Sequence, residues 1–269
     1  MSGWADVPVY RTLLRAALAG QASYRASFSL ELLGAGLVLA IEFAEVLAVF
    51  TQVPRVSGFS FAEVVLMFGL SSLAFSVADL LVGSIDGVSR HVRTGTFEVL
   101  MLRPLSPVGQ LAVGQVQLRR LGRLVVAAAA LALALSRVDV HWTPARVGVL
   151  VLAPVSGAVL FGAFLVASGA LSFWLVDGSE VGSALTYGSS YLSQWPVAVL
   201  GPLLGRVFTF VVPAAFIAYL PAVAILGRQE PLGLPSWLPW LTPLATAWAV
   251  VVSGLLWRAG VRHYTGAGG

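Results

Sequence analysis

The sequence contains no lysine and no cysteine. A Walker A loop needs a lysine to reach the β- and γ-phosphates of a nucleotide, so an ordinary P-loop is excluded and this chain is not expected to hydrolyse ATP. The lack of cysteine excludes disulfides, thiolate zinc sites and cysteine nucleophiles. The three histidines, His91, His141 and His263, lie far apart and form no HExxH pair. The sequence therefore predicts no metal site and no cofactor in this chain.

Charged residues are also scarce, at 10% of the 269 residues, whereas 58% of the residues are hydrophobic. A soluble domain carries roughly a quarter charged residues and less than half apolar ones. With a mean hydropathy of +0.89, the expected solvent is the bilayer. Backbone groups cannot stay unpaired in hydrocarbon, and the alternation typical of a barrel is absent. We therefore expect an all-α, polytopic membrane protein with a single permease domain over residues 1–269.

The apolar runs predict six transmembrane helices, each close to the ~20 residues that cross ~30 Å of hydrocarbon, although the last is short. They lie near residues 27–50, 61–83, 119–136, 147–174, 207–226 and 243–257. Residues 9–25 are expected to form a helix in the membrane interface, with the ragged start of the first span as the alternative. Residues 175–205 are interpreted as an inner connection with an amphipathic helix. A seven-span alternative counts 184–204 as a span.

The distribution of arginine supports the six-span topology. With both termini in the cytoplasm, the inner side carries Arg11, Arg15, Arg25, Arg90, Arg93, Arg103, Arg119, Arg120, Arg123, Arg206, Arg258 and Arg262, and the outer side carries Arg55, Arg137, Arg146 and Arg228. The positive-inside rule predicts such a bias. The seven-span alternative would place Arg258 and Arg262 on the outer side of the membrane. The N-terminus, MSGWADVPVY, does not resemble a signal peptide. We expect a multi-pass protein of the bacterial cytoplasmic membrane.

The connection between the second and third spans, residues 86–110, combines apolar and charged residues. Phe97, Leu100 and Met101 share a helix face at spacings of three and four. A rigid helix with an apolar knob and flanking charges fits a groove on a partner. Phe97 would fill a pocket there, and paired charges at Arg93 and Glu98 would fix the register. The alternative is a solvated loop whose arginines only set topology.

A family resemblance begins in this connection. The stretch RTGTFEVLMLRPLSPVGQL resembles the pattern of type-2 ABC exporter permeases, which has a Gly-Thr-aromatic-Glu element followed by Pro-Leu-Ser after the second span. The resemblance implies a cytoplasmic coupling helix that docks on a separate ATPase. The matching residues are Gly95, Thr96, Phe97 and Glu98, then Pro104, Leu105 and Ser106, with Arg93 before them and Arg103 adding charge.

The resemblance covers most of the chain. FWLVDGSEVGSALTYGSSYLSQWP, FVVPAAFIAYLPAVAILGR and LLWRAGVRHYTGAGG are similar to a subgroup described as viologen-exporter-like. That similarity implies six spans and a short re-entrant segment before the last one, a place that PLGLPSWLPWLTP fits. Trp237 and Trp240 would then belong to the outer aromatic belt.

Two acidic residues, Glu42 and Glu45, lie within the first apolar run and share a helix face. Carboxylates inside a membrane are costly and usually face a cavity, water or a partner charge. We interpret them as lining a path for cationic, amphipathic cargo. The alternatives are pairing with an arginine of a second permease, a place at the outer interface, or protonation with structural hydrogen bonds.

The arginines that begin the third span, Arg119, Arg120 and Arg123, are expected to anchor the chain to lipid phosphates. No nucleic-acid-binding fold is visible, because the basic side is a membrane rim.

The interpretation is a permease subunit of an ATP-driven ABC exporter. Its expected partners are two copies of an ATP-binding cassette ATPase, which hold ATP and Mg, and a second permease, identical or related. Two alternatives stay open. One is a scaffold or regulator of the same fold that does not transport. The other is a polytopic membrane enzyme, which the absence of GxSxG and HExxH disfavours.

Overall fold

The computed structural model describes Thr12 and residues 25–114, 117–175 and 178–264. The expected interfacial helix, residues 9–25, therefore lies almost entirely outside the described residues. The described residues form helices joined by turns, with one isolated bridge between Val56 and Phe59. The predicted all-helical class is confirmed for this part of the chain.

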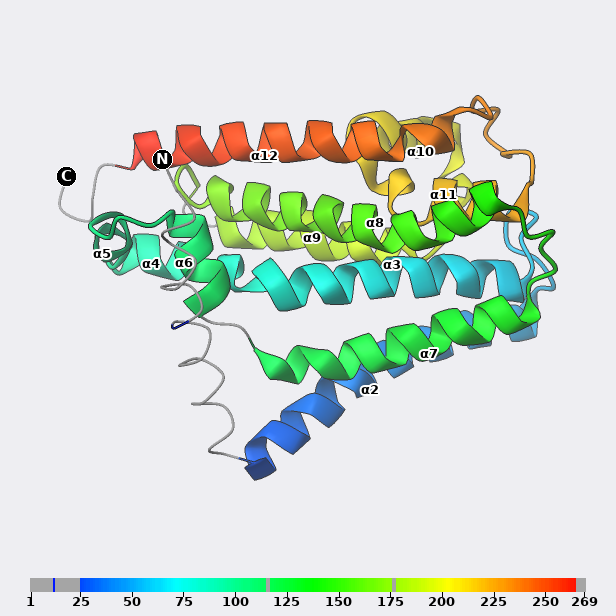
Figure 1. Ribbon diagram of the computed structural model, residues 1–269, viewed down its shortest axis with the longest axis horizontal. Helices are drawn as coiled ribbons and strands as arrows, with labels where there is room; N and C mark the ends of the chain where they lie inside the picture. Colours follow the sequence, from blue (N-terminus) through cyan, green and yellow to red (C-terminus); the bar gives the residue numbers. More distant parts are fainter. Residues whose placement is uncertain (1–11, 13–24, 115–116, 176–177, 265–269) are drawn as a thin grey trace.

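The helices follow one another in a simple order along the chain. They are α2 (Arg25–Gln52), α3 (Phe61–Val82), η2 (Gly83–Gly87), α4 (Val88–Arg93), α5 (Phe97–Met101), α6 (Pro107–Gly114), η3 (Leu118–Arg120), α7 (Leu121–Arg137), α8 (Pro144–Leu171), α9 (Gly178–Ser193), η4 (Val197–Leu200), α10 (Gly201–Phe210), η5 (Pro213–Phe216), α11 (Tyr219–Leu226), η6 (Leu238–Leu241) and α12 (Thr242–His263). The longer helices run along the long axis of the molecule, and α2 crosses obliquely (Figure 1).

Four helical segments of the described chain are long and apolar enough to cross a bilayer. They are Ser29–Gln52, Phe61–Arg93, Pro144–Leu171 and Leu238–His263. These segments overlap four of the predicted spans. The predicted third span overlaps α7, which has 17 residues and is therefore only about 26 Å long at 1.5 Å per residue. The arrangement is that of a multi-pass helical membrane protein.

Helix α3 is the centre of the bundle, between α7 and α8 (Figure 1). Its residues from Val64 to Leu70 are all buried. The helix begins where the Glu63 carboxylate accepts a hydrogen bond from the backbone N–H of Ser60 at 2.7 Å, which satisfies an otherwise unpaired donor. Gly69 allows α7 to approach closely, because a Cβ there would lie 2.7 Å from the Cα of Leu131. Small residues at such crossings are typical of membrane helices.

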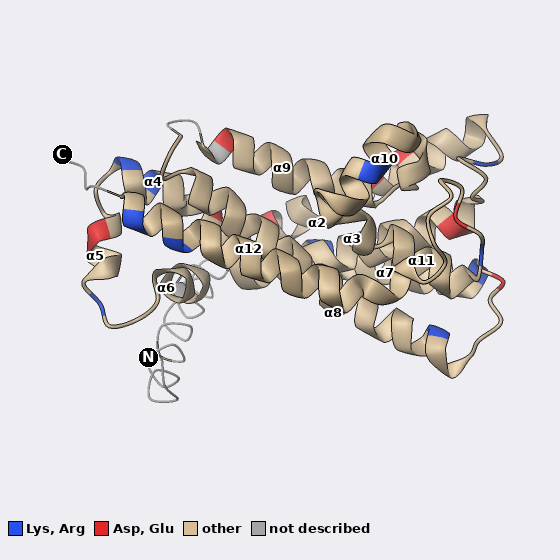
Figure 2. Cartoon of the chain, turned by 90° about the horizontal axis from the view of Figure 1, so that it is seen from above, with Lys and Arg blue, Asp and Glu red and all other residues tan. Residues whose placement is uncertain are grey.

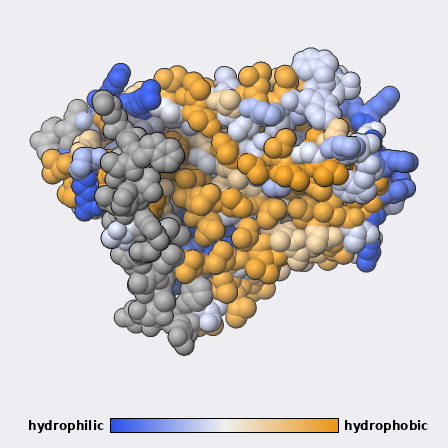
Figure 3. Space-filling view, in the orientation of Figure 1, coloured by the Kyte–Doolittle hydropathy of each residue, from blue (hydrophilic) through white to orange (hydrophobic). Residues whose placement is uncertain are grey.

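A broad apolar band covers the middle of the molecular surface (Figure 3). It includes exposed side chains of α2, α8 and α12, namely Leu30, Leu33, Leu37, Ile41, Val151, Leu152, Val155, Leu244, Val251 and Leu255. Hydrophilic residues gather at the two ends of the long axis (Figure 3). Because so large an exposed apolar surface is unfavourable in water, the band is the surface that lipid tails cover.

The two ends of the bundle differ in what they carry. One end holds α4 and α5, and we call it the α4–α5 end; the other holds the connections 53–60, 138–143 and 227–241 and is called the opposite end (Figure 1). In the view from above, many charged residues lie toward these ends, and few lie along the middle of α8 and α12 (Figure 2).

The structure corrects the predicted fifth span, because residues 207–226 do not form one helix. Helix α10 ends at Phe210, and α11 starts at Tyr219. The break lies at Pro213, which lacks a backbone N–H and clashes with the preceding helical turn. Extended backbone at Val212, with φ −109° and ψ 95°, marks the same break.

Residues 175–205 are likewise not a connection outside the bundle. Helix α9 runs alongside α8 (Figure 1). Gly182 of α9 faces the side chain of Ser168 on α8, so closely that a Cβ would overlap its hydroxyl. The chain from η4 to α11 then stays near the opposite end, since a Cβ on Gly205 would lie 2.7 Å from Leu232 Cδ1. Arg206, which was expected on the inner side, therefore lies near the opposite end.

Candidate functional site

The α4–α5 element, residues 88–106, is a compact pair of short helices beyond the end of α3. A tight turn joins α4 to α5 at Gly95, which has a φ of +69° that side chains disfavour. Thr94 Oγ1 donates to the Arg90 carbonyl at 2.9 Å. The Thr96 hydroxyl lies 2.9 Å from Thr94 Oγ1 and 2.8 Å from His91 Nδ1. Gly95 and Thr96 thus build the turn that presents α5.

The side chain of Phe97 points into the helix bundle. It is fully buried, with its ring centroid 5.0 Å from that of Phe173 and 5.3 Å from that of Tyr264. The expectation that Phe97 projects as the knob therefore does not match the structure. The sequence pattern identified an apolar face but did not show that the face is used to attach α5 to the bundle.

Other apolar side chains, in α5 and directly after it, project from the surface instead. Leu102 is 84% exposed, and Val99 and Met101 are also exposed. Charged residues close by in the sequence, Arg93, Glu98 and Arg103, are exposed as well. This exposed tip, formed by Val99, Met101 and Leu102, has the composition of a docking knob with a charged rim.

The chain leaves α5 within this tip and then turns into α6. Helix α5 ends at Met101, and α6 begins at Pro107. The buried Gln110 side chain fixes the turn by donating from Nε2 to the carbonyls of Leu100 at 2.8 Å and Leu105 at 3.0 Å. The Ser106 hydroxyl accepts from the Gly109 N–H at 3.1 Å at the start of α6. The tip is therefore presented on a well-supported loop.

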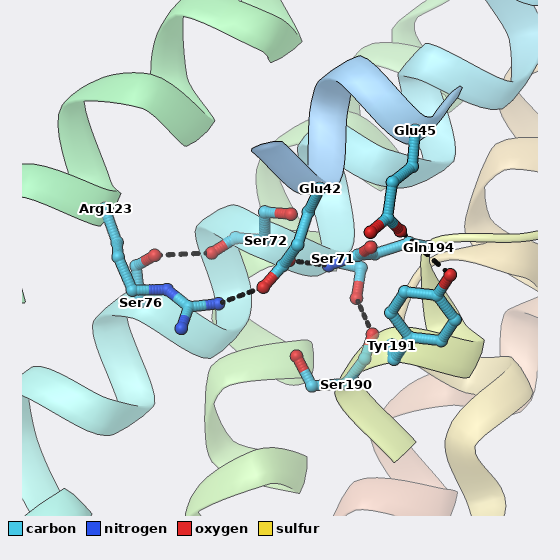
Figure 4. A network of polar contacts seen from close by, with 9 residues as sticks. All are labelled: Glu42, Glu45, Ser71, Ser72, Ser76, Arg123, Ser190, Tyr191 and Gln194. Carbon is cyan, nitrogen blue, oxygen red and sulfur yellow. Dashed lines mark hydrogen bonds and ion pairs between the residues drawn. The ribbon is translucent and has the colours of Figure 1, made fainter. Parts of the chain in front are cut away.

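A second group of candidate residues lies inside the bundle, where α2, α3, α7 and α9 meet (Figure 4). Glu42 of α2 accepts a hydrogen bond from Gln194 Nε2 at 2.8 Å and forms an ion pair with Arg123 of α7 at 3.4 Å. The Arg123 guanidinium also lies 5.1 Å from the centroid of the Phe75 ring. Glu42 is therefore compensated within the chain, whereas the sequence alone gave it no partner.

Glu45 lies one turn further along α2 and is exposed. Its carboxylate accepts a hydrogen bond from the Tyr191 hydroxyl of α9 at 3.0 Å (Figure 4). A similar pair lies nearer the α4–α5 end, where Tyr187 donates to Asp86 at 3.0 Å. Both tyrosines are exposed, at 43% and 46%. The face of α9 next to α2 thus presents aromatic rings whose hydroxyls bind carboxylates.

Two of the three arginines expected at the lipid surface turn into the bundle. Arg120 forms an ion pair with Asp79 of α3 at 3.2 Å, and its side chain is 13% exposed. Arg123 is 17% exposed and binds Glu42. Arg120 and Arg123 were expected to anchor the chain to lipid phosphates, but in the structure both guanidinium groups pair with carboxylates inside the bundle, where partners of opposite sign stabilise charges. The side chain of Arg119 lies outside what the structure describes.

Serines line the same region and were not singled out from the sequence. Ser71 and Ser72 of α3 and Ser189, Ser190 and Ser193 of α9 are all buried. Ser71 Oγ donates to the carbonyl of Ser190 at 3.4 Å, which links α3 to α9 (Figure 4). A signal was present in the sequence, because the serines recur at helical spacing in otherwise apolar runs.

At the opposite end, Trp237 and Trp240 are 58% and 54% exposed. Trp237 directly precedes η6 and Trp240 lies within it, just before α12 starts. Nearby, Arg228 forms an ion pair with Glu63 at 3.1 Å and donates to the Gly58 carbonyl at 2.9 Å. These contacts hold the connections of this end together. The predicted place of Trp237 and Trp240 in an outer aromatic belt stays a prediction.

The described residues contain no group of three or more histidine, aspartate or glutamate side chains arranged to hold a metal ion. A family model described as "ABC-2 family transporter protein" matches residues 37–268. No curated protein and no solved structure matches the chain.

Proposed function

Because this chain belongs to the ABC-2 family of transporter proteins, whose members normally work with an ATPase subunit, we propose that it is the permease of an ATP-driven exporter in the bacterial cytoplasmic membrane. The observation that carries this proposal is the α4–α5 element, which presents an exposed apolar tip on a buried support. ATP and Mg would be held by the partner chains, since a chain without lysine has no ordinary P-loop.

The exposed tip is the proposed contact with the ATPase. Leu102, with Val99 and Met101, would enter an apolar groove, and the rim of Arg93, Glu98 and Arg103 would select the register by paired charges. Gly95, Thr96 and Phe97 take a different part, because they shape and anchor the element. Each permease would engage one of two ATPase copies through this tip.

The arginine distribution supports placing the α4–α5 end in the cytoplasm, with the C-terminal end of α12 beside it. That end and the start of α7 carry Arg90, Arg93, Arg103, Arg119, Arg120, Arg123, Arg258 and Arg262, whereas Arg55, Arg137, Arg146, Arg206 and Arg228 lie at the opposite end. This bias is weaker than the sequence suggested, because Arg206 lies at the opposite end and not with the inner arginines. More arginines still lie at the α4–α5 end, as the positive-inside rule predicts for the cytoplasmic side.

The face formed by α2 and α9 is the proposed transport path. It carries exposed polar groups, Glu45, Tyr187 and Tyr191, at helix positions where lipid contact would be unfavourable. A second permease, identical or related, would cover this face and enclose the path between the two copies. The region where α2, α3, α7 and α9 meet holds the carboxylates of Glu42, Glu45, Asp79 and Asp86 against the guanidinium groups of Arg120 and Arg123.

This formal excess of negative charge supports a cationic, amphipathic cargo. Of the two acidic residues predicted to line the path, Glu42 and Glu45, only Glu45 is exposed. Its described partner is the neutral hydroxyl of Tyr191. An aromatic ring beside a carboxylate is favourable for an organic cation. The family match supports the ABC-2 class, and the similarity to the viologen-exporter-like subgroup stays a prediction.

Affinity purification from native membranes in mild detergent tests the proposal. We expect the wild-type chain to bring down a nucleotide-hydrolysing subunit. Leu102→Asp should lose that subunit because a charge would enter the apolar groove. The matched control is Val53→Asp, another exposed apolar residue, which lies at the opposite end and should retain it. A wild-type complex without ATPase activity would contradict the proposal, whereas activity that does not respond to any cargo would favour the scaffold alternative.

A further inference from the structure

Two cavities adjoin at the opposite end of the bundle. The larger, of about 590 Å³, lies between the end of α11 and the connection 227–241. The smaller, of about 150 Å³, lies between the start of α8 and the start of α12. Pro239 and Trp240 line both of them, so the two cavities are neighbours with one shared wall. The larger one has the volume typical of ligand sites, roughly 300–1,000 Å³.

The smaller cavity is an apolar groove beside the lipid-covered band. Ala145, Gly148 and Leu152 of α8 line it, and Leu152 is a 57% exposed member of that band. Thr242, one of its few polar lining residues, already donates its hydroxyl to the Pro239 carbonyl at 2.7 Å. Apolar surface of this kind is covered by hydrocarbon in a membrane, so the groove suits an acyl chain.

The larger cavity has two charged lining residues of opposite sign, Arg228 and Glu230. The Arg228 side chain is 36% exposed and forms an ion pair with Glu63. Its described hydrogen bonds, to Glu63 and to the Gly58 carbonyl, both use Nη1. A guanidinium group has five N–H donors on three nitrogens. The described contacts therefore leave Arg228 with donors for an anionic group in the cavity.

Glu230 is held in place by neutral donors. The hydroxyl of the fully buried Tyr219 donates to one carboxylate oxygen at 2.5 Å. The backbone N–H of Leu234 donates to the other oxygen at 2.8 Å. Among the residues that the structure describes, Glu230 takes part in no ion pair. A half-buried carboxylate without a counter-charge favours a cationic group as its ligand.

The charges around the larger cavity sum to zero. Besides Arg228 and Glu230, they include Glu63, paired with Arg228, and Arg146, whose guanidinium packs against the backbone of Gly227 in the cavity wall. A ligand with a net positive or negative charge would approach at least one group of its own sign. A zwitterion places a positive group at Glu230 and a negative group at Arg228, and so matches both.

We propose that the two cavities together bind one zwitterionic glycerophospholipid. Its headgroup ammonium donates to the Glu230 carboxylate, its phosphate accepts from Arg228, and one acyl chain follows the groove past Trp240 to Leu152. Exposed tryptophan is favoured at the level of lipid headgroups, which fits Trp240 at the junction of the two cavities. This site goes beyond the proposed function, because it requires only a membrane and holds with or without an ATPase partner.

Native mass spectrometry of the full-length, delipidated chain, titrated with phosphatidylethanolamine or phosphatidylglycerol of identical acyl chains, tests the headgroup. We expect the first phosphatidylethanolamine to bind about tenfold tighter, because only this lipid carries an ammonium that hydrogen-bonds to Glu230. Glu230→Gln should weaken phosphatidylethanolamine by about tenfold and leave phosphatidylglycerol unchanged or tighter. The matched control is Asp139→Asn, an exposed carboxylate at the same end outside the cavity lining, which should keep the wild-type preference.

Gly148→Phe tests the groove without altering any polar contact. No heavy atom lies within 4 Å of a Cβ on Gly148, so the ring fits locally and fills the groove. Both lipids should then bind about tenfold more weakly, since the acyl chain loses its place. Gly34→Phe on α2, where a Cβ also has open space, should bind both lipids as the wild type does. This variant also keeps the proposal testable if Glu230→Gln does not fold.

Four results would overturn the inference. The first is equal affinity of the wild type for the two lipids. The second is equal weakening of both lipids by Glu230→Gln, which would show that Glu230 only fastens the connection 227–241. The third is unchanged phosphatidylethanolamine binding in Gly148→Phe. The fourth is Glu230-dependent binding of tetraphenylphosphonium by a wild type without lipid preference, which would assign the cavity to cargo.

Discussion

Arg123 and Glu42 join α7 to α2 through an ion pair of 3.4 Å, although they lie far apart in the sequence. Their side chains are 17% and 21% exposed. Gln194, the residue after α9, completes the arrangement by donating to the other carboxylate oxygen at 2.8 Å. One carboxylate therefore connects α2 with α7 and with the end of α9.

Arg123→Gln should destabilise the protein by about 1–3 kcal/mol, because it leaves the partly buried Glu42 carboxylate without its counter-charge. Thermal unfolding in detergent measures the effect. The double variant Glu42→Gln and Arg123→Gln should recover part of the loss, since no unpaired charge remains. Strictly additive effects of the two single substitutions would show that the ion pair contributes nothing.

Glu45→Gln should impair export of a lipophilic cation by about tenfold, equivalent to ~1.4 kcal/mol, without lowering the unfolding temperature. The reason is that Glu45 is exposed, so its charge contributes little to the stability of the fold but is accessible to cargo in the proposed path. Uptake into inverted vesicles with the co-purified ATPase is the measurement. Glu31→Gln, an exposed carboxylate on the same helix, is the control. Equal export by the Glu45→Gln and wild-type proteins would remove Glu45 from the path.

Gly122→Ala should destabilise the contact between α2 and α7 by about 1–3 kcal/mol, because a Cβ on Gly122 would overlap the carbonyl oxygen of Leu32. Gly34→Ala on α2 is a matched control, since nothing lies within 4 Å of its Cβ. That change should be neutral or should stabilise the helix by up to about 1 kcal/mol. Similar unfolding temperatures for both variants would argue against the close helix crossing.

The variants Phe97→Ala and Leu102→Asp should lose different properties, stability in the first and ATPase binding in the second. Removing the fully buried Phe97 ring should cost about 3–5 kcal/mol of stability through the cavity it leaves, and so loosen the element. Leu102 is 84% exposed, so Leu102→Asp should leave the unfolding temperature unchanged while abolishing ATPase binding. Unfolding temperature and co-purification measured on the same preparations separate the two roles. A stable Phe97→Ala protein that loses the ATPase would return Phe97 to the docking surface.

Several features followed from the sequence itself. Low charge and long apolar runs determined a helical membrane protein, because only helices satisfy a single-chain backbone in hydrocarbon without strand pairing. The runs that became α2, α3, α8 and α12 were recognisable for the same reason. Pro107 stands at the first position of α6, where proline is favoured because its missing N–H needs no partner there.

The tertiary structure decided which way side chains point. In a membrane protein, lipid-facing and core-facing positions are equally apolar, so hydropathy does not distinguish them. Phe97 points inward because it packs against Phe173, Trp257 and Tyr264, which lie near the ends of helices that are distant in sequence. Arg120 and Arg123 turned inward because Asp79 and Glu42 face them. Such partners are fixed only when the helices pack, which is why composition gave the class of protein and packing gave its candidate sites.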